Sequence, residues 1–183
     1  CLLLLLWPLG LLSQNLKTGY LITSDYDTLS GFVGFARAET MAYMAKKNGE
    51  ENFFPMEDLV GFQLEGDRFE RHVVDVTMSN FPERRDVFLK VVVDGPVRFL
   101  EYEGSSLFGT MNTNHFLHHP GLEMPWLIPS NERQFKKQVA NFFREQEDLY
   151  KEIKAGELTY DDLNAIVIRY NVWSMTVPPQ DNN

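Results

Sequence analysis

Three of the four histidines of this 183-residue chain stand close together in the stretch NHFLHHPG, Asn114 to Gly121. Histidine is the side chain best suited to exchange a proton near neutral pH or to bind a transition metal. His118 and His119, with the carboxylate of Glu123 nearby, are therefore candidates for a metal site. His115, together with these two histidines, is a candidate for hydrolytic catalysis.

The stretch is predicted to be a β-strand, because it lacks the apolar spacing of a helix and ends at Pro120-Gly121, a turn signal. Side chains alternate along a strand, so His115 and His119 share one face and His118 lies on the other. His115 and His119 then stand roughly 13 Å apart, too far to bind one ion at ~2.0–2.1 Å. The pattern favours solvent-facing turn residues at His118 and His119, so no catalytic residue, metal or cofactor is assigned.

Other nucleophile motifs are weaker. The stretch GSSLFG, Gly104 to Gly109, has a glycine-flanked serine but does not match G-x-S-x-G, and it is interpreted as a loop. The single cysteine, Cys1, lies inside the apolar N-terminal segment, so the chain without that segment has no thiolate for metal binding or nucleophilic catalysis. The carboxylate pair Asp161-Asp162 lies at a predicted helix start, where the helix dipole accounts for it.

The N-terminal stretch CLLLLLWPLGLLSQ, residues 1–14, is uncharged and rich in leucine. It is predicted to be a signal peptide cleaved near Ser13 to Leu16. The chain begins without Met or a basic segment, so the start of the reading frame is expected to be missing. Because the run is shorter than about 20 residues and contains Pro8 and Gly10, no stable membrane span is expected. The expected location is periplasmic, secreted or at the cell surface.

The charge of the chain argues against nucleic acid as a partner. The formal net charge is −9 and neither sign forms a long block. A nucleic-acid binder is expected to carry a concentrated basic patch. The hydrophobic content of 44% and the aromatic content of 13% instead indicate a globular domain with a packed core.

Residues 18–128 show the alternation of β-strands, separated by turn signals. Asn48-Gly49, Gly66-Asp67 and Asp94-Gly95 supply the left-handed conformations that tight hairpin turns require. The predicted fold class is therefore α+β: an antiparallel β-meander, arranged as a sandwich, roll or partly open barrel, followed by three short C-terminal helices.

The helical part is predicted over residues 130–172, where the apolar spacing changes to that of amphipathic helices. Ser130 or Asn131 is suited to cap the first helix, Gly156 to end the second and Thr159 to cap the third. The apolar stripes of the three helices are predicted, in order, as Phe135, Val139, Phe142 and Phe143; Leu149 and Ile153; and Leu163, Ile166, Val167 and Tyr170. One domain is expected over residues 15–175, followed by a disordered tail at 176–183.

Four stretches, GYLITSDYDTLSGFVGF, FFPMEDLVGFQLEGDRF, VFLKVVVDGPVRFLEYE and the helical end from FKKQVANFF to DLNAIVIRYN, cover most of the chain after residue 14. In these stretches the chain resembles a family of uncharacterised secreted β-rich proteins of Gram-negative, Bacteroidetes-type bacteria. The resemblance implies an exported β-rich domain with C-terminal helices, and it carries over no catalytic residues. Asp27-Thr28-Leu29 is similar to an acceptor tripeptide that some of these bacteria O-glycosylate, which makes Thr28 a candidate modification site.

The leading functional hypothesis is a non-catalytic binding or scaffold module of the cell envelope, with an unidentified envelope protein or glycan as its partner. One alternative is a metal-dependent or other hydrolase that uses the region of His115, His118 and His119. Another is an assembly factor that docks onto an outer-membrane protein through an exposed apolar surface.

Overall fold

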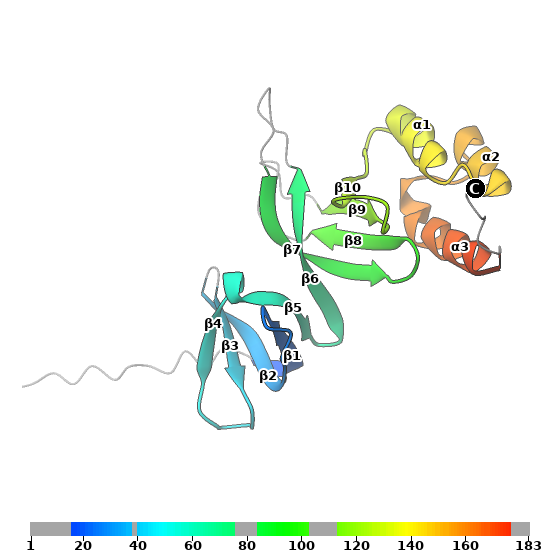
Figure 1. The fold of residues 1–183 in the computed structure, drawn as a ribbon. Coiled ribbons are helices and arrows are strands. Elements are labelled where there is room, and N and C mark those ends of the chain that lie inside the picture. The colour runs from blue at the N-terminus through cyan, green and yellow to red at the C-terminus, as the bar shows by residue number, and fades with distance from the viewer. Residues whose placement is uncertain (1–15, 38–39, 76–83, 103–112, 177–183) are drawn as a thin grey trace, which may run out of the picture. The chain divides into compact units, whose positions relative to one another are not determined.

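The computed structural model describes residues 16–37, 40–75, 84–102 and 113–176 (Figure 1). These residues form an open antiparallel meander of ten strands followed by three α-helices, which confirms the predicted α+β class. The predicted signal segment, residues 1–14, lies outside the described residues. The chain divides after Gly66 into two compact units, which are called here the N-terminal unit and the C-terminal unit. The expectation of one domain over residues 15–175 stays a prediction.

The N-terminal unit is a five-stranded antiparallel sheet in the order β5-β1-β2-β3-β4. Its elements are β1 (Lys17–Thr23), β2 (Thr28–Arg37), β3 (Thr40–Met44), β4 (Asn52–Pro55), the 3-10 turn η1 (Met56–Asp58) and β5 (Leu59–Leu64). Its buried apolar side chains among the described residues are Leu21, Val33, Met41, Ala42, Leu59 and Phe62. Met41 and Ala42 are adjacent on β3, so they point to opposite faces of the sheet, and both are buried.

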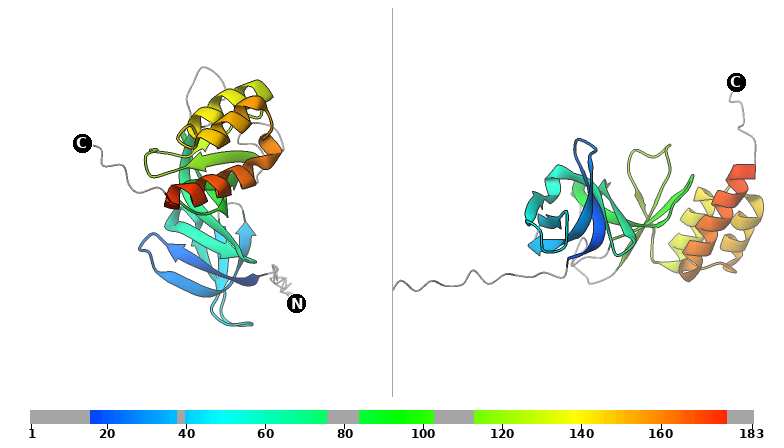
Figure 2. Two further views of the ribbon diagram at one scale, coloured as in Figure 1. Left: turned by 90° about the vertical axis from the view of Figure 1, so that its right-hand side faces the viewer. Right: turned by 90° about the horizontal axis from the view of Figure 1, so that it is seen from below.

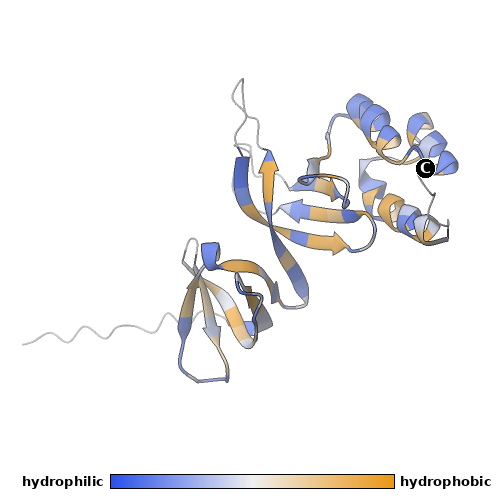
Figure 3. Cartoon of the chain, in the orientation of Figure 1, coloured by the Kyte–Doolittle hydropathy of each residue, from blue (hydrophilic) through white to orange (hydrophobic). Residues whose placement is uncertain are grey.

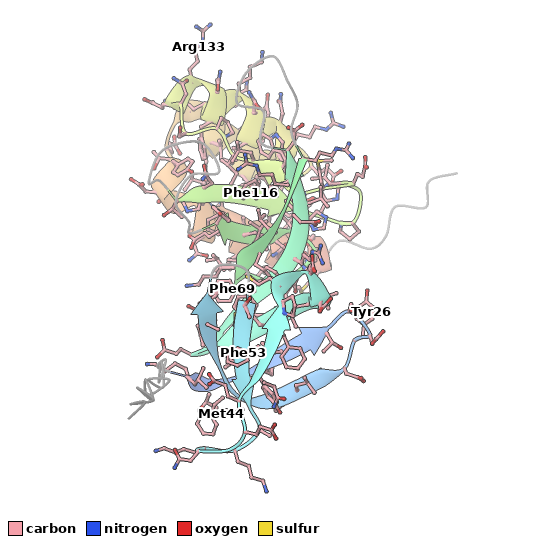
Figure 4. The ribbon with its side chains drawn as sticks, turned by 90° about the vertical axis from the view of Figure 1, so that its left-hand side faces the viewer. Tyr26, Met44, Phe53, Phe69, Phe116 and Arg133 are labelled. Carbon is pink, nitrogen blue, oxygen red and sulfur yellow. The ribbon has the colours of Figure 1, made fainter. Side chains whose placement is uncertain are left out.

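Asn48 and Tyr26 of the N-terminal unit adopt left-handed conformations in turns, and the turn at Asn48 is one that the sequence predicts. Asn48 adopts a left-handed conformation with φ of 62° between β3 and β4, and the amide of Gly49 donates to the carbonyl of Lys46. Tyr26 has φ of 65° at the tip of the β1–β2 hairpin, where its side chain is exposed (Figure 4). A tyrosine with positive φ carries a conformational cost that asparagine or glycine largely avoids.

The sheet of the C-terminal unit has the strand order β10-β9-β8-β7-β6 and is antiparallel at each pairing within the unit. Its strands are β6 (Asp67–Asp75), β7 (Arg84–Val93), β8 (Arg98–Tyr102), β9 (Asn114–His118) and β10 (Trp126–Leu127). Gly95, in the turn between β7 and β8, has φ of 152°, a conformation that favours glycine and was signalled by Asp94-Gly95.

The helical end consists of α1 (Glu132–Phe142), α2 (Glu147–Ala155), the 3-10 turn η2 (Tyr160–Asp162) and α3 (Leu163–Thr176), and the three helices lie together (Figures 1 and 2). Asn131 caps α1 by accepting from the amide of Gln134, and Gly156 ends α2 with φ of 81°. The carboxylate of Asp162 accepts from the backbone N–H of Thr159 at 2.8 Å. These contacts confirm the predicted helix boundaries at Asn131, Gly156 and Thr159.

Helix α3 continues to Thr176, beyond the predicted end of the helical part at residue 172. The first helix-breaking residue after this point is Pro178, so nothing in the sequence ends the helix earlier. The rest of the predicted tail, residues 177–183, lies outside the described residues. Among the described helices, none is both long and apolar enough to cross a membrane.

The C-terminal unit contains two hydrophobic clusters. One fills the space between the sheet and the helices, and its largest fully buried members are Phe135, Phe143, Leu117, Leu149 and Ile153. The other is formed by strands alone and consists of Val74, Val87, Leu89, Leu100 and Phe116. Phe116 and Leu117 are adjacent residues of β9 that belong to different clusters, and Figure 4 shows Phe116 among the strands. We call the face of the sheet that bears Leu117 the helix side and the face that bears Phe116 the far side.

Candidate functional site

Strand β9 distributes the three clustered histidines over both faces of the sheet. His115 and His119 contact aromatic side chains of the helical end, Tyr160 and Phe142 respectively, so both lie on the helix side. The ring of His118 instead contacts His72 of β6, with ring centroids 5.4 Å apart, on the far side. The predicted alternation of the three histidines is therefore confirmed.

On the helix side, His115 is the centre of a chain of hydrogen bonds. Its Nδ1 atom lies 2.8 Å from the hydroxyl of Tyr160, and its Nε2 atom lies 3.1 Å from Oε1 of Glu101. Glu101 is the direct cross-strand neighbour of His115 on β8, which explains how the register brings the pair together. The chain links β8 and β9 to the segment that begins α3.

The Glu101–His115–Tyr160 chain has the components of a proton relay: a carboxylate, an imidazole and a hydroxyl. Burial raises the pKa of Tyr160, and the negative charge of Glu101 acts in the same direction, so the phenol remains protonated at neutral pH. The ring of Tyr160 packs against Phe135 in the cluster between sheet and helices. The arrangement therefore attaches the helices to the sheet through an imidazole, a phenol and one carboxylate.

On the far side, the contact between His72 and His118 requires a strongly curved sheet. Strands β6 and β9 are separated by β7 and β8, so a flat sheet would place them roughly 14 Å apart. Their imidazole rings nevertheless meet, and Arg98 of β8 lies 2.6 Å from Glu70 of β6. The far side of the C-terminal unit is therefore concave, with its polar side chains converging next to the strand-only cluster.

Four of these converging side chains form a closed ring of ion pairs. Arg68 lies 2.8 Å from Asp94 and 3.3 Å from Glu70, while Arg98 lies 2.6 Å from Glu70 and 3.2 Å from Asp94. Each guanidinium thus bridges both carboxylates. The four side chains are a quarter to a half exposed, so solvent weakens the individual pairs. We call this group the ion-pair ring.

The pKa values of Glu70, Asp94 and His118 on the far side are shifted by burial and by the charged groups next to them. His72, whose Nε2 lies 3.5 Å from Oε2 of Glu70, and then the guanidinium groups of Arg98 and Arg68, lower the pKa of Glu70. A hydrogen bond from Arg68 is the main cause of the lowered pKa of Asp94. Burial lowers the pKa of His118, and positive charge on His72 acts in the same direction.

The predicted metal candidates do not meet at one point. His119 Nδ1 accepts a hydrogen bond from the amide of Gly121 at 2.9 Å, and the exposed carboxylate of Glu123 lies 3.5 Å from Arg84. Within the part of the chain that the structure describes, no group of three His, Cys, Asp or Glu side chains is placed to hold a metal ion. His118 and His119, expected to face solvent, are partly buried: the ring of His118 contacts His72 and that of His119 contacts Phe142.

Thr28, the candidate for modification, is the first residue of β2 and is exposed. It pairs with Ile22 at the end of the β1–β2 hairpin. Its O-glycosylation stays a prediction. The stretch GSSLFG, Gly104 to Gly109, lies outside the described residues.

Helix α3 has an exposed apolar face that the sequence reasoning missed. Its inner face holds the buried Leu163, Ile166 and Val167, as predicted. Its outer face bears Ile168, Val172 and Met175, which are 49%, 60% and 70% exposed. These three residues stand at i, i+4 and i+7, so they form one stripe along the helix. We call these three residues the outer stripe. The sequence signal for it is the near absence of charge, because Arg169 is the only charged residue in this 14-residue helix.

The position of α3 is fixed by a buried side-chain amide. Asn171 accepts from the backbone N–H of Val97 at 2.8 Å and donates to the carbonyl of the same residue at 2.8 Å. Arg169 makes two hydrogen bonds to Glu152 of α2, at 2.6 and 2.9 Å. The outer stripe is therefore presented on a helix that is attached to both the sheet and the neighbouring helix.

In the comparisons with known proteins, no family model, no curated protein and no solved structure matches the chain.

Proposed function

We propose that the protein is an exported, non-catalytic binding or scaffold module of the cell envelope, located in the periplasm or at the cell surface. The observation that carries the proposal is the outer stripe of α3. Three large apolar side chains, half or more exposed, lie in register on one helix. Exposed apolar side chains that gather in one place mark interaction sites, whereas scattered single ones do not.

The contrast with the two neighbouring helices supports a binding role for α3. Helices α1 and α2 bury their apolar residues and carry charged residues on their outer faces, which Figure 3 shows mainly in blue. Helix α3 shows orange turns in the same view. An apolar helix face with anchors at i, i+4 and i+7 is the arrangement with which a helix binds an apolar groove or a second helix.

The histidines have structural partners, which favours a binding role over hydrolysis. His115 is bonded at both ring nitrogens, His119 accepts from the amide of Gly121, and His118 packs against His72. The contacts of His115 and His118 join elements of the C-terminal unit, and that of His119 lies within the turn after β9. Export is supported by the apolar N-terminal segment, residues 1–14, and by the resemblance to secreted proteins.

Affinity capture from envelope extracts tests the proposal. The full chain serves as bait beside two variants, Val172→Asp in the centre of the outer stripe and Gln138→Asp on the exposed face of α1. We expect one or more envelope proteins to be enriched by the wild type and by Gln138→Asp, and to be lost with Val172→Asp. Equal recovery with all three baits, or no enrichment at all, would contradict a binding role for the outer stripe.

An assembly factor would use the same exposed apolar surface as a scaffold. The identity of the captured protein, and not the effect of Val172→Asp, therefore separates these two alternatives. Stoichiometric capture of an outer-membrane protein would favour the assembly factor over a general scaffold. The hydrolase alternative has one observation in its favour, the pairing of His115 with Glu101 at 3.1 Å. It predicts that His115→Phe abolishes a hydrolytic activity of the purified chain without unfolding it.

A further inference from the structure

Strands β6 and β9 contact each other through two imidazole rings, although they are not neighbours in the sheet. The ring centroids of His72 and His118 lie 5.4 Å apart, and β7 and β8 stand between the two strands. The side chain of His72 is only 13% exposed, and His118 is partly buried. The contact therefore closes the concave far side with two side chains of the type that takes up a proton in mild acid.

Of the two rings, that of His72 has a carboxylate close by. Its Nε2 atom is buried and lies 3.5 Å from Oε2 of Glu70. A proton on His72 therefore gains an ion pair with Glu70, since opposite charges within about 4 Å attract each other strongly in a partly buried site. A single proton, carried by His72, leaves the contact intact.

The surroundings of His118 oppose a positive charge. Arg98 is its direct cross-strand neighbour on β8. Burial lowers the pKa of His118, and so does positive charge on His72, Arg98 and His119. A hydrogen bond to the backbone at Leu122 acts against them. A proton on His118 while His72 is charged places two imidazolium groups in contact, beside a guanidinium group.

The other neighbours of the contact do not neutralise a second proton. The charged or titratable residues on the far side, or next to His118 in the chain, are Arg68 and Glu70 of β6, Arg85 of β7, Arg98 and Tyr102 of β8, Asp94 of the β7–β8 turn, and His119. Opposite His72, β7 places the apolar Val87. The two carboxylates of the ion-pair ring are already matched by its two guanidinium groups, so the ring cannot balance two imidazolium groups as well.

We infer that the contact between His72 and His118 is an acid-operated switch, which holds β6 and β9 together until both rings carry a proton. The two like charges then part the strands, because water screens their repulsion only weakly in a partly buried contact. Parting widens the concave far side and exposes the strand-only cluster around Phe116. The switch acts within the C-terminal unit and does not depend on the proposed role of the outer stripe.

An NMR titration of the imidazole C–H signals tests whether the two rings interact. It uses the full chain, His72→Phe and the control His119→Phe. We expect His118 to take up its proton at a pH about half a unit to one unit higher in His72→Phe, because the charge of His72 is gone. His119→Phe is expected to change the titration of His118 much less. An unchanged titration of His118 in His72→Phe would overturn the inference.

Binding of the dye ANS, which fluoresces on exposed apolar surfaces, tests the opening itself. Acidification of the wild type from about pH 7.5 to about 5 is expected to raise its fluorescence about threefold or more, at constant circular dichroism. His118→Phe and His72→Phe keep an aromatic ring but lose one proton site, so both are expected to show no rise, whereas His119→Phe should behave as the wild type.

Three outcomes of the dye experiment would each contradict the switch. The first is equal fluorescence of the wild type at both pH values, and the second is the same rise in His118→Phe and His72→Phe. The third is a rise that coincides with loss of the helical circular dichroism signal, because the whole chain would then be unfolding. Capture of an envelope protein by the outer stripe is a separate measurement, so the proposed function can fail or stand independently.

Discussion

The two sides of strand β9 hold polar groups in different ways. On the helix side, Glu101, His115 and Tyr160 form a linear chain with one carboxylate, in a space that α1 and α3 cover. On the far side, two arginines and two carboxylates form the ion-pair ring beside two histidines. Burial penalises charge that is not neutralised, and the more enclosed side holds a single carboxylate, whereas the far side pairs two carboxylates with two guanidinium groups. One strand can therefore serve two environments, because its side chains alternate between the two faces of the sheet.

The largest loss of stability is expected when the buried core residue on either side of β9 is truncated. Phe116→Ala and Leu117→Ala each delete a fully buried side chain, and each is expected to lower the free energy of unfolding by about 2–5 kcal/mol. Urea denaturation followed by circular dichroism measures both. Similar losses would show that the strand-only cluster is a core in its own right. A loss below about 1 kcal/mol for Phe116→Ala would contradict this, because the far side would then contribute little to stability.

The next test removes the amide that holds α3 on the helix side. Asn171→Leu leaves the N–H and C=O groups of the buried Val97 without their partner and is expected to cost about 2–4 kcal/mol. The control, Asn164→Leu, changes an exposed asparagine of the same helix and is expected to stay within about 0.5 kcal/mol. Thermal or urea unfolding distinguishes the two; equal effects would mean that Asn171 does not anchor the helix.

A smaller effect is expected from the hydrogen-bond chain of His115. Tyr160→Phe removes the hydroxyl that bonds Nδ1 of His115 and should lower the free energy of unfolding by about 1–2 kcal/mol. Tyr150→Phe is the matched control, because its hydroxyl has no part in this chain. If both variants unfold at the same urea concentration as the wild type, the chain does not stabilise the attachment of the helices.

The smallest expected effect is a pH dependence confined to the far side. The pKa of His118 is lowered in the folded protein, chiefly by burial, so below pH 6.5 the unfolded chain takes up a proton at this position more readily. Stability should therefore decrease as the pH falls from about 7.5 to 5, while the lowered pKa values of Glu70 and Asp94 keep these two far-side carboxylates ionised. His118→Gln should reduce this slope, while His119→Gln should retain it. Unfolding curves at several pH values measure the effect; the same slope in His118→Gln would contradict the assignment.

The local features of this fold could be predicted from the sequence. Asparagine, glycine and threonine at Asn131, Gly156 and Thr159 mark the helix ends because caps depend on nearby backbone groups alone. The alternation of His115 and His118 in β9 is likewise a property of one strand. Such features need no knowledge of which strands are neighbours.

The long-range contacts could not be predicted from the sequence. The meeting of His72 with His118 depends on the curvature of four strands, and the bond of Asn171 to Val97 joins residues 74 positions apart. Nothing in the spacing of the residues around Tyr160 marks it as a partner of His115, which lies 45 positions earlier in the chain. Pairing register and sheet curvature are set by the whole unit, which is why spacing within one segment does not reveal them.

The bond between Asn171 and Val97 makes one backbone amide a reporter for the whole helical end. The N–H of Val97 is bonded to a side chain of α3 and to no neighbouring strand within its own hairpin, so its exchange with solvent deuterium requires α3 to move away. Amides of the helices themselves can exchange by local fraying, whereas this one reports the separation of helix from sheet. The rate at which Val97 exchanges would therefore give the free energy of that single opening event, separate from the unfolding of the protein.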